Sequence, residues 1–329
     1  MKDKNIFVTV VIITKNEEEY ISETLNSLLK QDYPTKDYEI IIVDGKSTDK
    51  TQEIIKRFQK KYRKIRLFIE KVEKTSQGSA RNLAVSRARG EFIAFIDGDC
   101  IANKDWLSSL TASLSKESEK DPLVEGVGGI IEPTLDKNWK ENLIANILCT
   151  FLGSGRRNIS GKHISPIPNY NSIHIKKILK KEKYSDIKDA DDLELNQRLK
   201  GKGYKSILDP KITVKHHQEQ SFSKFLKKMF NYGKAQAKVF KKIKKIRYFA
   251  VLAPLYFIIV FISLIISLFT MNFLLVTLLI LLYLIAILIQ SIILLIKTRK
   301  IYSLLAIVVY PMMHKSYSLG VLAGFLHEK

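Results

Sequence analysis

The chain of 329 residues has only two cysteines, Cys100 and Cys149. This scarcity excludes a disulfide-stapled scaffold and fits a reducing compartment. Residues 1–5 lack the long apolar core and the small-residue cleavage site of a signal peptide. No nucleic-acid-binding module is recognisable, although the formal net charge is +21. The basic excess therefore favours a membrane surface and phosphate-bearing partners, with no nucleic acid among them.

Charge is absent from two long apolar runs, residues 249–270 and 273–296. Each run exceeds the roughly 20 residues that a membrane-spanning helix needs. Only Met271 and Asn272 separate the runs, so we expect a hairpin. Lysine- and arginine-rich clusters at 241–247 and 297–300 flank it, and the positive-inside rule places both clusters in the cytoplasm. We therefore expect a multi-pass protein of the cell membrane whose N-terminal domain is cytoplasmic.

Residues 301–326 form a third, weaker apolar segment that Pro311, His314 and Lys315 interrupt. It fits a kinked span, a re-entrant segment or an interfacial helix. Residues 221–247 mix apolar residues at helical spacing with many lysines, which favours an amphipathic helix in the membrane interface. A helix packed on the preceding domain with a solvated basic face is the alternative. The expected organisation is a folded domain at 1–220, interface helices at 221–247 and a transmembrane region at 248–329.

The first two thirds of the chain alternates strand-like and helix-like segments. Strands are predicted at 7–13, 39–43, 65–69 and 92–96, with helical patterns between them. This alternation predicts an α/β domain with a mostly parallel sheet. Ligands of such sheets bind at the carboxyl ends of the strands. Polar residues recur at those ends, although each carboxylate alone has a plain explanation as a helix cap or turn residue: Thr14, Glu17, Asp44, Asp97 and Asp99.

Two carboxylates separated by one glycine, Asp97-Gly98-Asp99, end the apolar run at 92–96. Carboxylate oxygens are ligands that Mg²⁺ and Mn²⁺ prefer, and Gly98 allows a ligand to approach the backbone closely. A simple turn is the alternative, because Asp-Gly is common in turns.

Four segments together carry a resemblance to a known family. They are Val11-Ile12-Ile13-Thr14-Lys15-Asn16-Glu17, Val43-Asp44-Gly45-Lys46-Ser47-Thr48-Asp49, Ala80-Arg81-Asn82 and Gly90-Glu91-Phe92-Ile93-Ala94-Phe95-Ile96-Asp97-Gly98-Asp99. In this order they resemble the GT-A domain of family 2 glycosyltransferases, over roughly the first two thirds of the chain. The resemblance implies a Rossmann-like GT-A fold that binds a nucleotide-sugar donor, a UDP- or GDP-sugar, with Mn²⁺ or Mg²⁺.

The resemblance also implies roles for these residues. Thr14, Glu17 and Asp44 would hold the base and ribose of the donor, and Arg81 would lie near its diphosphate. Asp97 would lie near the ribose or the metal, and Asp99 would bind the metal. A growing negative charge on a departing nucleoside diphosphate is the kind of charge that a divalent cation stabilises.

An acidic cluster at 189–192 precedes a helical pattern and resembles the family's Glu-Asp-x-x-Leu-x-x-Arg-Leu element, in which the Asp is the catalytic base. Asp192 takes that position, and Asp191 stands where Glu is usual. Either carboxylate fits the role of base, and plain capping of the helix N-terminus is the alternative. His216 matches a metal-binding His of many members, with His217 as its neighbour. A surface or capping His is the plain alternative for either one.

These features predict a membrane-bound, inverting, metal-dependent glycosyltransferase that transfers one sugar to a lipid-linked acceptor, either a polyprenyl phosphate or a lipid-linked glycan. With a phosphate acceptor, Asp192 would orient the acceptor, since there is little need to remove a proton. The alternative is a processive polysaccharide synthase of the cellulose or hyaluronan synthase type. The chain lacks the Gln-x-x-Arg-Trp element of those synthases. A non-enzymatic membrane scaffold is a further alternative, opposed by the intact set of aspartates.

Overall fold

The computed structural model describes residues 6–70, 76–133, 138–154, 163, 164, 166–188, 190–243 and 248–326. The chain divides into two compact units. The sheet unit comprises residues 1–132 and 159–217, and the helical unit comprises residues 133–158 and 218–329. A middle stretch of the chain, 133–158, therefore belongs with the C-terminal helices. The predicted Asp189 and the basic residues 244–247 lie outside the described residues.

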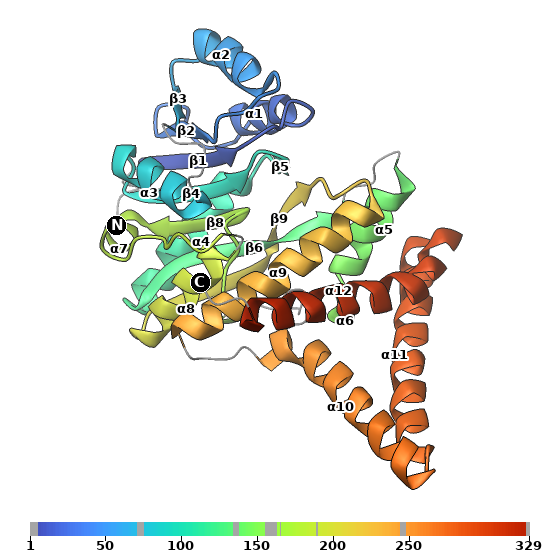
Figure 1. Ribbon diagram of the computed structural model, residues 1–329. Coiled ribbons are helices and arrows are strands. Elements are labelled where there is room, and N and C mark those ends of the chain that lie inside the picture. Colours follow the sequence, from blue (N-terminus) through green and yellow to red (C-terminus); the bar gives the residue numbers. More distant parts are fainter. Residues whose placement is uncertain are drawn as a thin grey trace. The chain divides into compact units, whose positions relative to one another are not determined.

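The sheet unit is built on one sheet whose strand order is β3-β2-β1-β4-β8-β6-β9-β5, with β7 paired to β9 (Figure 1). β1 pairs in parallel with β2 and β4, and β2 pairs in parallel with β3. β8 joins β4 and β6 in antiparallel fashion, and β5 and β7 do the same with β9. The strands are β1 (Val8–Thr14), β2 (Tyr38–Asp44), β3 (Ile65–Ile69), β4 (Phe92–Asp97), β5 (Cys100–Ala102), β6 (Val124–Pro133), β7 (His163–Ile164), β8 (Asn171–Ile175) and β9 (Lys205–His216).

The parallel half of the sheet matches the strands and helices predicted from the sequence. Helices alternate with its strands, and the helices of this unit are α1 (Ile21–Leu29), α2 (Thr51–Lys61), α3 (Gln77–Arg87), α4 (Trp106–Lys120), α7 (Lys176–Lys181) and α8 (Asp191–Gly201). The α/β class is therefore confirmed. The antiparallel pairing of the remaining strands was not predicted from the sequence.

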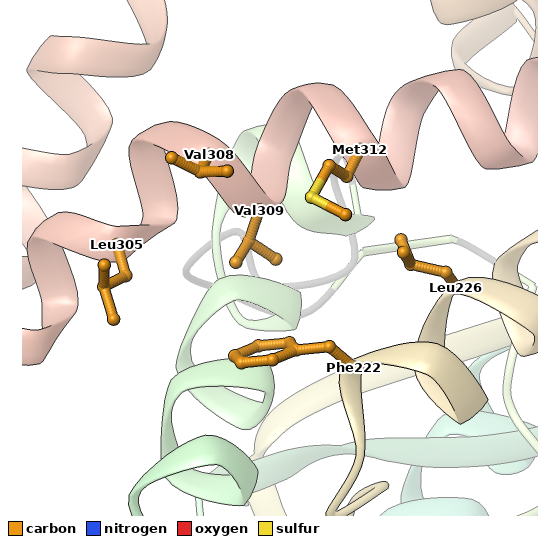
Figure 2. Close-up of a pocket in the computed structure, with 6 residues that line it drawn as sticks. All are labelled: Phe222, Leu226, Leu305, Val308, Val309 and Met312. Atoms are coloured by element: carbon orange, nitrogen blue, oxygen red, sulfur yellow. The ribbon is translucent and has the colours of Figure 1, made fainter.

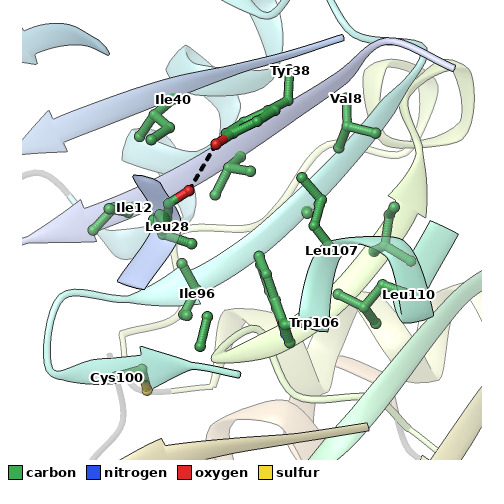
Figure 3. Close-up of a cluster of buried hydrophobic side chains, with 14 of the residues drawn as sticks. Val8, Ile12, Leu28, Tyr38, Ile40, Ile96, Cys100, Trp106, Leu107 and Leu110 are labelled. Carbon is green, nitrogen blue, oxygen red and sulfur yellow. Dashed lines mark hydrogen bonds between the residues drawn. The ribbon is translucent and has the colours of Figure 1, made fainter. Parts of the chain in front are cut away.

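Apolar side chains of the central strands alternate between two buried clusters, one on each face of the sheet. Val10 and Ile12 join the first cluster, whereas Val11 joins the second. Helices α1, α2 and α4 cover the first face, and α3, α7 and α8 contribute to the second. Figure 3 shows the first face, where the hydroxyl of Tyr38 donates to the carbonyl of Leu28 at 2.9 Å. Burial on both faces is the reason the parallel strands read as nearly unbroken apolar runs.

The helical unit consists of α5 (Trp139–Leu148), α6 (Phe151–Ser154), α9 (Phe222–Ile243), α10 (Tyr248–Thr270), α11 (Leu274–Thr298), the 3₁₀ helix η2 (Ile301–Leu305) and α12 (Ala306–Leu326). One apolar cluster holds α5, α9, α11 and α12 together. Its members include Leu143 and Ile147 of α5, Phe225 of α9 and Tyr310 of α12. The stretch 133–158 therefore supplies a side of the helical core.

Helices α10 and α11 coincide with the two uncharged runs of the sequence. Large apolar side chains are exposed along both, such as Phe261, Phe269 and Leu274. Of the described residues, α11 alone is long and apolar enough to cross a membrane by length and composition, and Pro254–Thr270 of α10 is a shorter apolar stretch. Passage of both helices through a membrane stays a prediction.

Candidate active site

The loops that follow β1 and β2 interlock at the carboxyl edge of the sheet. Thr14 and Asp44 are register partners at the ends of these strands. The Asn16 backbone, which is left-handed at φ 58°, donates from its N–H to Ser47 Oγ at 2.8 Å. The Asn16 side chain accepts from the Thr48 N–H at 2.8 Å. The sequence motifs at 11–17 and 43–49 thus form one structure.

Asp44 organises the second of these loops from a fully buried position. Its carboxylate accepts from the Ser47 N–H at 2.9 Å, from the Ser47 hydroxyl at 2.5 Å and from Gln52 Nε2 at 2.6 Å. These bonds fix the start of α2 relative to the strand end. The Glu17 N–H reaches the same region by donating to Thr51 Oγ1 at 2.8 Å.

Thr14 faces Gly98 across the sheet edge. A β-carbon added at Gly98 would lie 3.1 Å from Thr14 Oγ1 and 3.4 Å from Glu17 Cγ. The Thr14 hydroxyl is buried and has no hydrogen-bond partner among the described residues. A buried hydroxyl of this kind is a group that a bound ligand can satisfy. Thr14, Glu17 and the Asp97-Gly98-Asp99 turn therefore lie side by side, as the sequence predicted.

The acidic turn is held firmly from both sides. Asp97 ends β4 in register with Ile13 of β1, next to the Thr14 position. The Thr24 hydroxyl donates to the Gly98 carbonyl at 2.7 Å, and the His217 N–H donates to the Asp99 carbonyl at 3.1 Å. The turn is consequently anchored to α1 and to the end of β9.

Asp99 and His216 form a pair suited to a divalent cation. Asp99 Oδ2 lies 3.2 Å from His216 Nε2, and both side chains are mostly buried. Cys100 pairs with His216 across β5 and β9, and the ligand atoms of all three residues lie within 4.8 Å of one another. Carboxylate oxygens suit Mn²⁺ and Mg²⁺, and an imidazole nitrogen is a common ligand of metal ions in proteins.

Cys100 is unsuited to join this pair as a ligand. Burial, together with the charges of Asp99 and Asp97, raises the pKa of the Cys100 thiol well above its ordinary value. Sulfur is a soft ligand that suits Zn²⁺ and Cu⁺, whereas Mn²⁺ and Mg²⁺ prefer hard oxygen ligands, so Cys100 is the poorer ligand for these two ions. Asp99 and His216, the two residues predicted from the sequence, are the candidates.

A buried ion pair joins the sheet edge to the N-terminus of α8. Arg81 of α3 donates from Nη1 to Asp191 Oδ2, and each side chain is less than a tenth exposed. Burial opposes the charged guanidinium, but the carboxylates of Asp191 and Asp97 more than offset it and raise the pKa of Arg81. The Tyr184 ring lies 5.7 Å from the guanidinium carbon. This contact between Arg81 and Asp191 was not predicted.

Asp192 is the second carboxylate at the same helix end. It is only half-buried, and its Oδ1 accepts from the Leu193 N–H at 2.6 Å. Asn196 donates to the Asp192 carbonyl at 2.7 Å and bonds with Ile167 through its amide, which ties the first turn of α8 to residues 166–167. Asp191 is buried and paired with Arg81, so Asp192 is the more accessible carboxylate of the two.

The structure therefore brings the predicted residues together in linked groups. Thr14, Glu17, Asp44 and Asp97 share one sheet edge, and Asp99 meets His216. Arg81 connects the edge to Asp191, and Asp192 follows by its place in the sequence.

Sequence reasoning missed a second His contact and a buried polar network. His217 stacks on Tyr20 with ring centroids 4.2 Å apart, and its Nε2 lies 3.2 Å from Glu23 Oε2. Glu125 bonds with His174 at 2.8 Å and accepts from Ser206 at 2.6 Å. All of these pairs join residues far apart in the chain, so no local pattern could have revealed them.

A sheet whose parallel strands end in carboxylates, with an Asp–His pair beside them, is typical of α/β proteins that bind nucleotides at the sheet edge. The chain belongs to glycosyl transferase family 2, whose family model matches residues 9–182. The match includes Thr14, Glu17, Asp44, Arg81, Asp97 and Asp99. It ends before Asp191, Asp192 and His216.

Two archaeal relatives are similar over most of the chain. A Methanococcus voltae protein named "Dolichyl N-acetyl-alpha-D-glucosaminyl phosphate 3-beta-D-2,3-diacetamido-2,3-dideoxy-beta-D-glucuronosyltransferase" is 32% identical over 267 residues, covering 79% of this chain and 82% of the relative. Glycosyltransferase AglE from Haloferax volcanii is 27% identical over 247 residues, covering 71% and 74%.

A solved structure shares the fold. The mannosyltransferase PcManGT from Pyrobaculum calidifontis, in complex with GDP-Man and Mn²⁺, has a TM-score of 0.65 and 18% identity, covering 98% of this chain and 88% of that one. This likeness confirms the predicted GT-A fold.

Proposed function

We propose that the protein transfers a single sugar from a nucleotide-sugar donor to a lipid-linked acceptor, with inversion at the anomeric carbon. The observation that carries this proposal is the Asp99–His216 pair beside the sheet edge that holds Thr14, Glu17 and Asp97. It is supported by membership of the family and by the relative from Methanococcus voltae, whose name describes transfer to a dolichyl-linked sugar phosphate.

The donor would lie along the sheet edge. The hydroxyl of Thr14 offers a hydrogen bond to the base or ribose, and Glu17 and Asp44 complete that part of the site. Asp97 would lie near the ribose. Asp99 and His216 would hold Mn²⁺ or Mg²⁺, which, when bound, supplies positive charge to the departing nucleoside diphosphate. Arg81 adds positive charge near Asp97 from its buried position.

Asp192 is the proposed general base. The Arg81 guanidinium pairs with the Asp191 carboxylate, so the second carboxylate at the N-terminus of α8 is the one that an acceptor can reach. An ionised Asp192 would accept the proton of an acceptor hydroxyl as its oxygen attacks the anomeric carbon. A sugar hydroxyl, as in the name of the Methanococcus relative, requires this step, whereas a polyprenyl phosphate does not.

The helical unit would hold the enzyme on the membrane. Its hairpin of α10 and α11 exposes apolar side chains along both helices, a surface that water does not favour. We infer that both helices enter the bilayer, that the basic clusters at 241–247 and 297–300 stay on the cytoplasmic side, and that donor and acceptor meet there.

The test is transfer by purified protein in lipid nanodiscs with Mn²⁺. A panel of UDP- and GDP-sugars is offered with either polyprenyl phosphate or a polyprenyl-linked N-acetylglucosamine phosphate, and products are weighed by mass spectrometry. One added sugar is expected for one donor. A ladder of products would indicate the processive synthase instead, and no transfer from any donor would oppose the proposal.

Asp192→Asn tests the base. We expect the turnover number to fall about 10²–10⁴-fold, because general base catalysis contributes that much. Nucleotide binding measured by calorimetry should be unchanged. Asp32→Asn, at an exposed site before β2, is the matched control and should keep full activity. Near-normal turnover of Asp192→Asn with a hydroxyl acceptor would rule out this role.

A further inference from the structure

Leu305 of η2 and most of the exposed residues of α12 form an apolar stripe that Lys315 interrupts. They recur every three or four residues, which places them on one side of the helix. Lys315 is the exposed charge within this stripe. The stripe consists of Leu305, Val308, Met312, Leu319, Leu322 and Leu326.

The remainder of α12 is committed to contacts inside the helical unit. Tyr310 shares a hydrogen bond of 2.8 Å with Thr150, and His314 lies 2.8 Å from both the Tyr283 hydroxyl and the Leu152 carbonyl. The backbones of α12 and α9 approach each other closely where the two helices pack. A β-carbon added at Gly320 would lie 2.0 Å from the Phe230 carbonyl oxygen, and one added at Gly233 would lie 2.1 Å from that of Tyr317.

The contacting residues follow the same order along α9 and α12. Ser316 bonds with Leu226, Gly320 meets Phe230, and Lys241 donates to Phe325 near the end of α12. The two helices therefore lie side by side and point the same way, as Figure 1 shows. Whatever orientation α12 takes in a membrane, α9 takes it too.

Lysines on the part of α9 that α12 leaves uncovered decide that orientation. They recur from one end of α9 to the other, at Lys224, Lys227, Lys238 and Lys242, and all of these are exposed. A helix pair crossing the bilayer would carry some of these charges into hydrocarbon, which is costly. A pair lying flat keeps the α9 lysines out and puts the apolar residues of the α12 stripe against the acyl chains, while the long side chain of Lys315 reaches the headgroups.

We propose that α12 lies flat in the membrane interface, with its apolar stripe inserted into one leaflet of anionic lipid. This inference rests on the membrane location within the proposed function. The stripe is continuous with the apolar hairpin, since η2 and α12 follow α11 directly and α12 packs against α10. No acidic residue occurs between Ser221 and Leu326, and exposed Lys297, Arg299 and Lys300 precede the stripe. Both features favour anionic headgroups.

A cavity of about 200 Å³ opens along the first half of this stripe (Figure 2). Every lining residue is apolar, so the cavity suits an acyl chain of the same leaflet. The lining residues are Phe222, Leu226, Leu305, Val308, Val309 and Met312.

Depth-dependent fluorescence quenching tests the proposal. Leu305→Cys, at the end of η2, and Met312→Cys, Leu319→Cys and Leu326→Cys, on one side of α12, carry a thiol-linked fluorophore at seven-residue steps. The full chain is placed in vesicles of phosphatidylglycerol and phosphatidylcholine brominated at a shallow or a deep acyl position. Wild-type protein treated alike gives the background from Cys149, and Lys238→Cys on α9 is the matched control.

A flat α12 predicts that all four labels are quenched alike and best by the shallow bromines, while Lys238→Cys is hardly quenched. A spanning α12 would move the label by about 10 Å at each step, at 1.5 Å per residue, and the quenching depth would shift progressively. That result would overturn the proposal. So would four unquenched labels with a dimer in light scattering, which would assign the stripe to a second copy of the chain. The measurement needs no sugar transfer, so its failure is separate from failure of the proposed activity.

Discussion

The two units of this chain use apolar residues in opposite ways. In the sheet unit they fill two buried clusters, and the large apolar side chains that are exposed among its described residues are few, such as Ile69, Leu123 and Ile164. In the helical unit, the described side chains of α10, α11 and α12 include many exposed large apolar ones. The acidic residues of the candidate site lie in the sheet unit, whereas residues 221–326 have none. The proposed chemistry and the proposed membrane attachment thus fall in separate parts of the chain.

The largest expected effect comes from cutting the chain between the units. A chain ending at residue 220 keeps α5 but loses α9 and α12, so Leu143, Ile144 and Ile147 lose their cover. We expect this chain to aggregate during gel filtration. A second variant, in which a Gly-Ser linker also replaces residues 133–158, should run as a monomer and bind UDP or GDP. A monodisperse 1–220 chain would show that α5 belongs with the sheet unit.

Breaking the buried ion pair tests how the sheet unit supports its site. Arg81→Met leaves Asp191 buried without its partner, which should lower the free energy of unfolding by about 3–5 kcal/mol. The double variant Arg81→Met/Asp191→Leu should recover much of this loss in chemical denaturation. Arg57→Met, at an exposed pair on α2, is the control and should change little. Equal losses from Arg81→Met and Arg57→Met would refute the importance of the buried pair.

Metal affinity separates the two candidate partners of Asp99. His216→Ala should weaken Mn²⁺ binding at least about 10-fold, because a ligand is lost. Cys100→Ala should leave the affinity unchanged, since Mn²⁺ prefers hard oxygen ligands to a soft sulfur ligand. Titration followed by Mn²⁺ electron paramagnetic resonance measures both. A weaker affinity in Cys100→Ala than in His216→Ala would reverse the assignment.

The smallest expected effect concerns the packing of the helical unit. Gly320→Val places a side chain against the Phe230 carbonyl and should cost about 1–3 kcal/mol of stability in detergent. Leu322→Val, on the exposed stripe, should cost less. Nucleotide binding by the sheet unit should be the same in both variants. Loss of nucleotide binding in Gly320→Val would mean that the units are not energetically separate.

Local sequence pattern predicted the parallel half of the sheet well. Its buried strands are apolar runs, and the helices between them show apolar residues at the 3.6-residue spacing of a helix. It could not place β8, which lies between β4 and β6 at the centre of the sheet. Asn171, Ser172 and His174 are polar residues of this strand, yet all are buried. Asn171 is satisfied by distant groups, accepting from Trp106 and donating to the carbonyls of Ile130 and Ile212. Because polar contacts stabilise β8, its sequence lacks the apolar pattern from which the other strands were predicted.

In the candidate site, too, the sequence pattern predicted some of the features and only the fold revealed others. The positions of Thr14, Asp44, Asp97 and Asp99 at strand ends predicted that they lie at one edge of the sheet. The carboxyl ends of parallel strands meet at that edge. The contact of Arg81 with Asp191 joins residues 110 positions apart, and only the fold reveals it. The choice between Asp191 and Asp192 as base depended on that contact.

The central claim is that Asp99 helps to hold a cation that also binds the donor diphosphate. It is tested most directly by Mn²⁺ electron paramagnetic resonance on wild-type protein and Asp99→Asn, each with and without UDP or GDP. The account predicts that a nucleoside diphosphate tightens Mn²⁺ binding in the wild type and that Asp99→Asn loses this coupling. Equal coupling in both proteins would contradict it.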